Sequence, residues 1–206
     1  YHFKEQQCVP CVNDGGLSVG MGLYFFNKKC KYFEYRFETP FYGFSDEKNI
    51  DKTLEEYHFF IENIERDAAT TRAALDIEKE PIIWIDGKAE SGPRALGHRS
   101  ILGNPLKSNH KDFLNQYKQR EWWRPVAPII LEEKMQEWFI DAFESPYMLN
   151  NFKIKPKLAQ KVPAILHLDE SARVQTLRKE DNYRLYAVIS DFEKITGVPM
   201  VCNTSL

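Results

Sequence analysis

Hydrophobic and polar positions follow two alternating periods along the chain, which predicts a fold of alternating helices and strands. From Leu54 to Ala68, apolar residues recur at spacings of three and four with charged residues between them, so an amphipathic helix is expected over 51–70. Short apolar runs bounded by turn residues predict strands at 81–85, 126–131, 164–168, 174–177 and 199–202. Further helices are expected at 109–119, 132–139 and 182–195. This alternation places the fold in the α/β or α+β class.

Residues 8–40 are predicted as a strand, a glycine-rich turn, a helix and a second strand. The turn is Asn13-Asp14-Gly15-Gly16, whose residues tolerate positive φ and whose polar side chains bond their own backbone. A turn of this kind can hold an anion or present a carboxylate to a metal, although most such turns do neither. A domain boundary is expected near 40–50, in the irregular aromatic segment that follows.

Composition narrows the class of protein. The chain has 206 residues, of which 43% are hydrophobic and 28% are charged, which describes a globular protein and excludes disordered and fibrous ones. No apolar run approaches the roughly 20 residues needed to cross a membrane, and the N-terminus lacks a secretory signal. These features predict a cytoplasmic protein without membrane contact.

The four cysteines do not form a disulfide framework for a secreted protein of this size. Cys8 and Cys11 have the C-x-x-C spacing of half a zinc ribbon or of a redox pair, but a second pair and a thioredoxin-like pattern are both missing. Ordinary thiols are therefore the favoured interpretation. The histidines are unclustered and have no partnered nucleophile, so a hydrolase triad is not expected.

The small net charge of −2 conceals an asymmetry along the chain. Residues 41–80 contain eleven acids and five bases, whereas residues 88–124 contain eight bases and three acids. The basic stretch is either a solvated helix face or a field focused on an anion such as phosphate.

Two segments of the basic stretch carry candidate chemistry. Residues 88–100 place Arg94 and Arg99 around a Gly-Pro turn after a buried strand, a pattern that suits phosphate but also fits a basic surface turn. Residues 115–125 alternate cations with Trp122 and Trp123, as in platforms for single-stranded nucleic acid. Core tryptophans with neighbouring cations lying along apolar surface are the more frequent case. Arg173 adds a further possible anion ligand at the start of a strand.

Taken together, five segments resemble the C-terminal region of the O-carbamoyltransferases that modify nodulation factors and antibiotics (NodU/CmcH type). The order and spacing match across nearly the whole chain, and the run Gly-Pro-Arg-Ala-Leu-Gly-His-Arg-Ser-Ile-Leu is highly specific. The segments are residues 87–102, 115–125, 145–148, 172–176 and 203–205.

The resemblance implies two domains. Residues 1–45 would be the last part of an ASKHA-type, Kae1-like domain that holds a metal and transfers a carbamoyl group to a hydroxyl. Residues 46–206 would form most of a YrdC-like α/β domain that converts ATP and carbamoyl phosphate into carbamoyl adenylate. Because the chain stops directly after an apolar strand, we expect this second domain to be truncated.

The resemblance also implies roles for individual residues. Lys118, Arg173 and Arg94 would be catalytic, neutralising phosphates and stabilising the charge that develops as the adenylate forms. Asn203 and Ser205 would orient the carbamoyl group, with Arg99, Arg120 and Arg124 as secondary candidates for binding substrate or nucleotide. Asp14 would be a metal ligand, its partners lying upstream of the chain.

The implied cofactors are ATP with Mg²⁺ as a substrate, and Fe²⁺ or a similar divalent metal in the complete Kae1-like domain. The implied partners are carbamoyl phosphate, ATP and a hydroxyl-bearing acceptor of unknown identity. Nucleic acid is not expected as a partner. The alternative hypothesis is a YrdC-like RNA- or nucleotide-binding module without turnover, which a steep salt dependence of polynucleotide binding would reveal.

Overall fold

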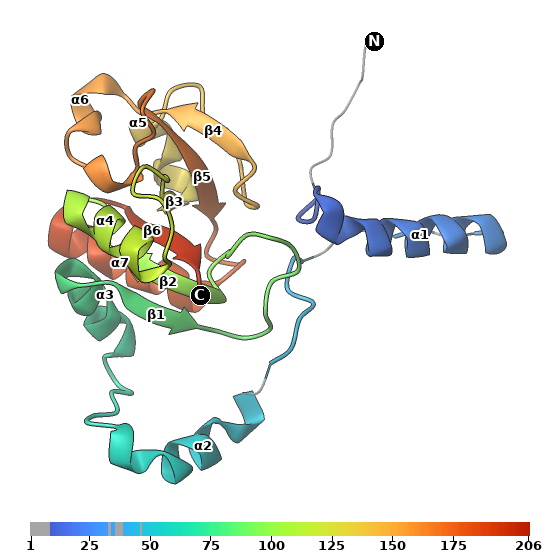
Figure 1. Ribbon diagram of the computed structural model, residues 1–206, viewed down its shortest axis with the longest axis horizontal. Helices are drawn as coiled ribbons and strands as arrows, with labels where there is room; N and C mark the ends of the chain where they lie inside the picture. The colour runs from blue at the N-terminus through green and yellow to red at the C-terminus, as the bar shows by residue number, and fades with distance from the viewer. Residues whose placement is uncertain (1–8, 33, 36–38, 46) are drawn as a thin grey trace.

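A six-stranded mixed sheet forms the centre of the molecule (Figure 1). The computed structural model describes residues 9–32, 34–35, 39–45 and 47–206. The strand order is β1-β2-β6-β3-β5-β4, in which β3 and β5 are parallel and the other neighbours are antiparallel. The strands are β1 (Ile82–Ile85), β2 (Arg99–Gly103), β3 (Ala127–Leu131), β4 (Asn150–Lys153), β5 (Ser171–Leu177) and β6 (Met200–Ser205).

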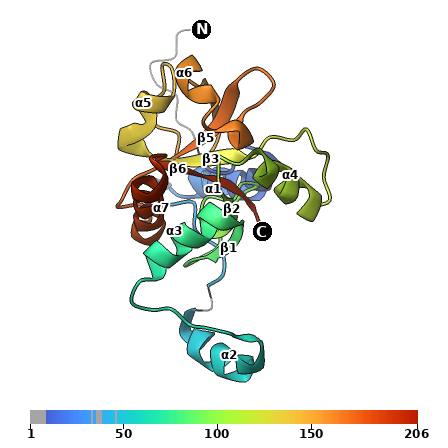
Figure 2. The same ribbon diagram turned by 90° about the vertical axis from the view of Figure 1, so that its left-hand side faces the viewer.

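Helices cover both faces of this sheet. α3 (Ala69–Lys79) and α7 (Tyr183–Thr196) pack against each other on one face, and α4 (Ser108–Tyr117) lies on the other face (Figure 2). Short helices lie in the connections from β3 to β4 and from β4 to β5: α5 (Met135–Trp138) and α6 (Pro156–Ala159). The same connections contain 3₁₀ turns at Glu132–Lys134 and Pro163–Ile165. The mixed α/β class predicted from the alternation of elements is confirmed, and a mixed sheet of this kind is consistent with a YrdC-like domain.

α7 shows how the sequence defines an element at both ends. The Asn182 side chain accepts a hydrogen bond from the backbone N–H of Leu185, which caps the start of the helix, and Gly197 ends it at a φ of 74°. Its inward face repeats at spacings of three and four and is fully buried: Leu185, Val188, Ile189 and Phe192. This face packs against a central strand, β3, whose residues are all buried.

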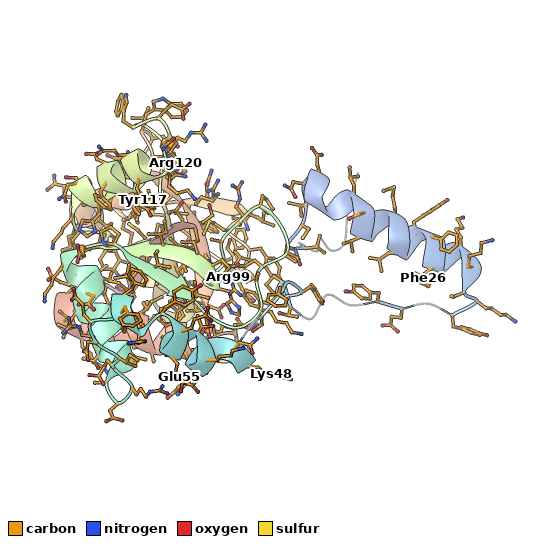
Figure 3. All side chains as sticks on the ribbon, turned by 60° about the horizontal axis from the view of Figure 1, so that its bottom comes forward. Phe26, Lys48, Glu55, Arg99, Tyr117 and Arg120 are labelled. Atoms are coloured by element: carbon orange, nitrogen blue, oxygen red, sulfur yellow. The ribbon has the colours of Figure 1, made fainter. Side chains whose placement is uncertain are left out.

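Two helices stand apart from this core. α1 (Leu17–Lys29) and α2 (Ile50–Glu56) have no buried residue among those described, and both lie away from the sheet in Figures 1 and 2. Phe26, near the end of α1 in Figure 3, is 53% exposed. None of the helices in the described part of the chain has the length and apolar character needed to span a membrane.

The structure confirms the predicted strands at 81–85, 126–131, 174–177 and 199–202, and the predicted helices at 109–119 and 182–195, with shifts of a few residues at their ends. The segment predicted as a helix over 132–139 divides into a 3₁₀ turn and the short α5. The predicted glycine-rich turn and helix near residue 14 are also present, as a 3₁₀ turn at Asp14–Gly16 and α1.

Three predictions about elements are wrong. The helix over 51–70 ends at Glu56, because its apolar positions Tyr57 and Ile64 are about half exposed and have no surface to pack against. The strand at 164–168 is a 3₁₀ turn that begins at Pro163 and buries Ala164 and Ile165 in the core. The strand predicted before the first helix is absent from residues 9–12, whereas the strand predicted after that helix falls largely on residues 33 and 36–38, which lie outside the described residues.

Candidate anion site

Five of the predicted site residues line one small cavity of about 150 Å³ at the end of the sheet where β6 stops and β3 begins. They come from four separate parts of the chain: Arg94 from the loop before β2, Arg120 from the turn after α4, Arg173 from β5, and Asn203 and Ser205 from β6. The remaining lining residues are Pro93, Ala95, Pro125, Val126, Ala127, Met148 and Thr204.

The loop that carries Arg94 is held by a carboxylate within the same loop. One oxygen of Glu90 accepts hydrogen bonds from the backbone N–H groups of Leu96 at 2.7 Å, His98 at 2.8 Å and Arg99 at 3.1 Å. Three N–H groups converging on one ionised oxygen make a strong, geometrically defined cradle. The loop therefore closes on itself before any ligand binds.

Neighbouring strands fix the same loop from outside. The Asn203 side chain donates to the Ala95 carbonyl at 2.8 Å, and the Gln175 side chain donates to the Leu96 carbonyl at 2.9 Å. Gly97 lies at a φ of 98°, and a Cβ there would come within 2.4 Å of the Leu185 side chain. Only glycine allows the loop to approach α7 so closely.

The end of α4 positions the second group of cations. The N–H of Arg120 bonds to the Asn115 carbonyl at 3.0 Å, the N–H of Gln119 bonds to the Gln116 carbonyl at 2.9 Å, and Gln119 lies at a φ of 49°. These features form a Schellman motif, which reverses the chain after the last turn of a helix. Lys118 then reaches the end of β6, where its ammonium donates to the Ser205 hydroxyl at 3.0 Å.

Three guanidinium groups meet at this cavity without a counter-charge. No carboxylate is among its described lining residues. Burial lowers the pKa of Arg173 to about 10, and the nearby charges of Arg94 and Arg120 add to the effect. Burial likewise lowers the pKa of Arg120 and that of Lys118. Like charges brought together out of water destabilise the empty site and favour an anion.

Unsatisfied hydrogen-bonding atoms indicate the same conclusion. In the described structure, the buried Nε of Arg94, Nη2 of Arg120, Nε of Arg173 and Oδ1 of Asn203 have no hydrogen-bond partner. Buried polar atoms without partners are rare in folded proteins. Three are donors suited to an anion, and the fourth is an acceptor suited to an N–H group beside that anion.

Two predicted arginines, Arg99 and Arg124, lie elsewhere. Arg99 donates to the carbonyls of Phe44, Asp86, Gly87 and His98 and so connects Phe44 to the residues around Asp86 and Gly87. Figure 3 shows Arg99 apart from Arg120. Arg124 is exposed and pairs with Glu121 at 2.5 Å. Neither residue lines the cavity.

Asp14 is also exposed, and no group of three or more His, Cys, Asp or Glu residues in the described chain is arranged to hold a metal ion. The described residues therefore do not form a metal site by themselves, and we assign no chemical step to one. Cys11, Cys30 and Cys202 are free thiols, and Cys8 lies outside the described residues.

The interpretation of Trp122 and Trp123 as core residues is wrong. Their exposed fractions are 73% and 52%, because the turn after α4 projects from the body of the protein. The guanidinium of Arg124 lies 5.8 Å from the centre of the Trp123 ring. Neither tryptophan lines the cavity.

Several supporting residues escaped sequence analysis. Glu90 and Asn115 lie inside the two basic segments, whose composition indicates the cations as ligands but does not indicate which residues position them. Gln175 had a usable signal, since it lies two residues after Arg173 in a strand and must share its face. Met148, at a φ of 55°, gave no signal in the sequence for its place in the cavity wall.

Comparisons with known proteins add an independent line of evidence. The family model described as "Carbamoyltransferase C-terminus" matches residues 73–206. The chain is 44% identical over 133 residues to "Nodulation protein U" of Sinorhizobium fredii, a match covering 65% of this chain and 24% of that protein. It is 31% identical over 214 residues to the "3'-hydroxymethylcephem-O-carbamoyltransferase" of Amycolatopsis lactamdurans, covering all of this chain and 38% of that protein. The chain thus spans about a quarter of the length of its nodulation relatives.

Proposed function

The chain belongs to the carbamoyltransferase family through its C-terminal region, and on that premise we propose that its cavity binds carbamoyl phosphate and the phosphates of ATP to form carbamoyl adenylate. The observation that carries the proposal is the set of unpartnered buried atoms: three arginines offer N–H donors and Asn203 offers an acceptor. Carbamoyl phosphate has the complementary groups, since its phosphate accepts hydrogen bonds and its amide nitrogen donates them.

Each residue has a distinct proposed part. Arg94, Arg120 and Arg173 hold phosphate oxygens and neutralise the charge that increases as the phosphorus is attacked. Lys118 is bonded to Ser205, which lines the cavity, and from there we propose that it meets a second phosphate group. Asn203 orients the carbamoyl group through its free oxygen while its nitrogen holds Ala95.

The proposed formation of carbamoyl adenylate consists of two displacement steps. Water releases inorganic phosphate from carbamoyl phosphate and leaves carbamate. A carbamate oxygen then attacks the α-phosphorus of ATP, and pyrophosphate leaves with Mg²⁺, which enters as part of the nucleotide substrate. The carbamoyl group is next transferred to an acceptor hydroxyl, a step that we assign to the preceding domain, of which residues 1–45 would be the end.

Calorimetric titration of the chain with carbamoyl phosphate and with ATP tests the proposal. We expect saturable binding that Arg173→Ala and Lys118→Ala each weaken roughly tenfold or more, as losing a hydrogen bond to a charged group implies. Arg178→Ala is the matched control, because Arg178 directly follows β5, the strand that carries Arg173, but is already paired with Asp181 at 2.9 Å. Equal binding by all four proteins would exclude this cavity as the site.

The exposed Trp122 and Trp123 support a second candidate, binding of a single-stranded polynucleotide on the turn after α4. Titration with an oligonucleotide at two salt concentrations distinguishes the two functions. Polynucleotide affinity that falls steeply with salt favours the second candidate, and no measurable affinity leaves the first.

A further inference from the structure

Arg120 is held at the cavity by a neutral side chain. The Oδ1 atom of Asn115 accepts a hydrogen bond from the Arg120 Nε at 2.8 Å, and the Asn115 carbonyl accepts one from the Arg120 N–H at 3.0 Å. Asn115 itself is 1% exposed, on the last turn of α4. Both the backbone and the side chain of Arg120 are therefore fixed by this one residue.

The same amide also fixes the rest of the turn. Its Nδ2 atom donates to the carbonyl of Trp122 at 3.1 Å and to that of Arg124 at 2.9 Å. The side chain of Asn115 thus makes three hydrogen bonds to the turn that carries the cations. Arg120 keeps one buried nitrogen, Nη2, unpartnered at the cavity.

Orienting a buried guanidinium is more often done by a carboxylate, which binds it strongly but also cancels its charge. An amide provides the same acceptor atom without the charge. The pKa of Arg120 is lowered by burial and by Arg124, which agrees with a cation left uncompensated. Its full charge therefore remains available to a ligand.

We propose that Asn115 is a positioning residue for the anion site, which aims Arg120 into the cavity and, being neutral, leaves its charge for the bound phosphate. The inference rests on the proposed function of this cavity. It predicts that ligand affinity depends directly on whether the side chain of residue 115 is an amide or a carboxylate.

Asn115→Asp tests whether the neutrality of this side chain matters. It keeps the size of the side chain and the acceptor for Arg120, but a carboxylate oxygen replaces the Nδ2 donor to the Trp122 and Arg124 carbonyls, so a structural role predicts a loss of affinity that does not depend on Arg120. The proposed role predicts a loss that requires Arg120, because the new carboxylate pairs with Arg120 and neutralises it. Asn104→Asp is the matched control, since Asn104 is also buried, donates to the Glu78 carbonyl and lies outside the cavity lining.

The experiment is calorimetric titration with carbamoyl phosphate at pH 7. We expect Asn115→Asp to weaken binding roughly tenfold to hundredfold, Asn115→Ala to weaken it less, and Asn104→Asp to change it less than about twofold. In an Arg120→Ala background, Asn115→Asp should have little further effect, since the charge that it cancels is gone. All variants are also made in a Gln119→Gly background, which relieves the positive φ and keeps a destabilised variant folded.

Each outcome is decisive. If Asn115→Asp binds as tightly as the unmodified chain, or weakens binding equally with and without Arg120, the positioning role is wrong while the anion site stands. If the unmodified chain does not bind carbamoyl phosphate, the proposed function fails first and the positioning role fails with it.

Discussion

Replacing Arg173 with methionine should make the ligand-free protein more stable while removing its ability to bind an anion. Burial, with Arg94 and Arg120 nearby, lowers the pKa of this guanidinium to about 10. A cation whose pKa is lower in the folded than in the unfolded chain reduces stability at every pH below the lowered value. The cost is therefore present in full at pH 7, and it disappears with the charge.

The size of the effect follows from the same shift. The fall to about 10 from the ordinary value of a guanidinium corresponds to roughly 3 kcal/mol, at about 1.4 kcal/mol for each pH unit. Since the cavity opens to solvent and the side chain is partly exposed, screening reduces this figure, and we expect a gain of about 1–2 kcal/mol in the free energy of unfolding. Methionine retains an apolar stem that can lie along the same wall.

Urea unfolding at pH 7, with and without phosphate, measures both parts of this prediction. Arg178→Met is the control: its ion pair with Asp181 raises the pKa of Arg178, so its loss should lower stability by less than about 1 kcal/mol. Phosphate should raise the stability of the unmodified chain and of Arg178→Met, but not that of Arg173→Met. A loss of stability in Arg173→Met equal to or greater than that in the control would refute the inference that Arg173 carries an uncompensated charge.

Three further substitutions test the framework around the site. Gly97→Ala should lower the free energy of unfolding by about 2–4 kcal/mol, from backbone strain at φ 98° and collision with Leu185, and a thermal melt that did not shift would contradict the tight approach. Gln119→Gly should raise it by about 0.5–1 kcal/mol by relieving φ 49° at the end of α4, without changing anion affinity; lower stability in urea would show that the Schellman turn is misassigned. Glu90→Gln should cost about 1–2 kcal/mol and weaken carbamoyl phosphate binding, because an amide oxygen holds three N–H groups less strongly than a carboxylate. Unchanged calorimetric affinity would show that Glu90 does not position Arg94 for binding.

The hydrophobic pattern predicted an element correctly wherever that element also packs against the core. The stretch that forms α7 shows its helix start at Asn182, its buried face and its glycine stop directly in the residues. The apolar run of β3 likewise became a fully buried strand. The helix predicted over 51–70 has an equally regular pattern, yet it stops at Glu56, because periodicity stabilises a helix only when its apolar face is buried.

Strands without a continuous apolar run were not predicted from the sequence. β2 begins at Arg99 within the segment interpreted as a binding loop, and β4 is the polar stretch Asn150–Lys153. Both are strands because they pair with neighbours already in place, β2 with β6 and β4 with β5. Pairing between distant segments supplies the hydrogen bonds that their own composition does not predict.

By itself, the sequence determined the α/β class, the family resemblance and the chemical identity of the site residues, because side-chain type and short-range spacing are properties of the chain alone. Only the tertiary structure decided which cations share a cavity: Arg94, Arg120 and Arg173 meet there, whereas Arg99 and Arg124 turn to other partners. It also revealed Glu90 and Asn115 as the groups that hold the cations in place. Burial, missing counter-charges and unpartnered atoms arise only when distant segments fold together and exclude water, and these features distinguish a binding site from a basic surface.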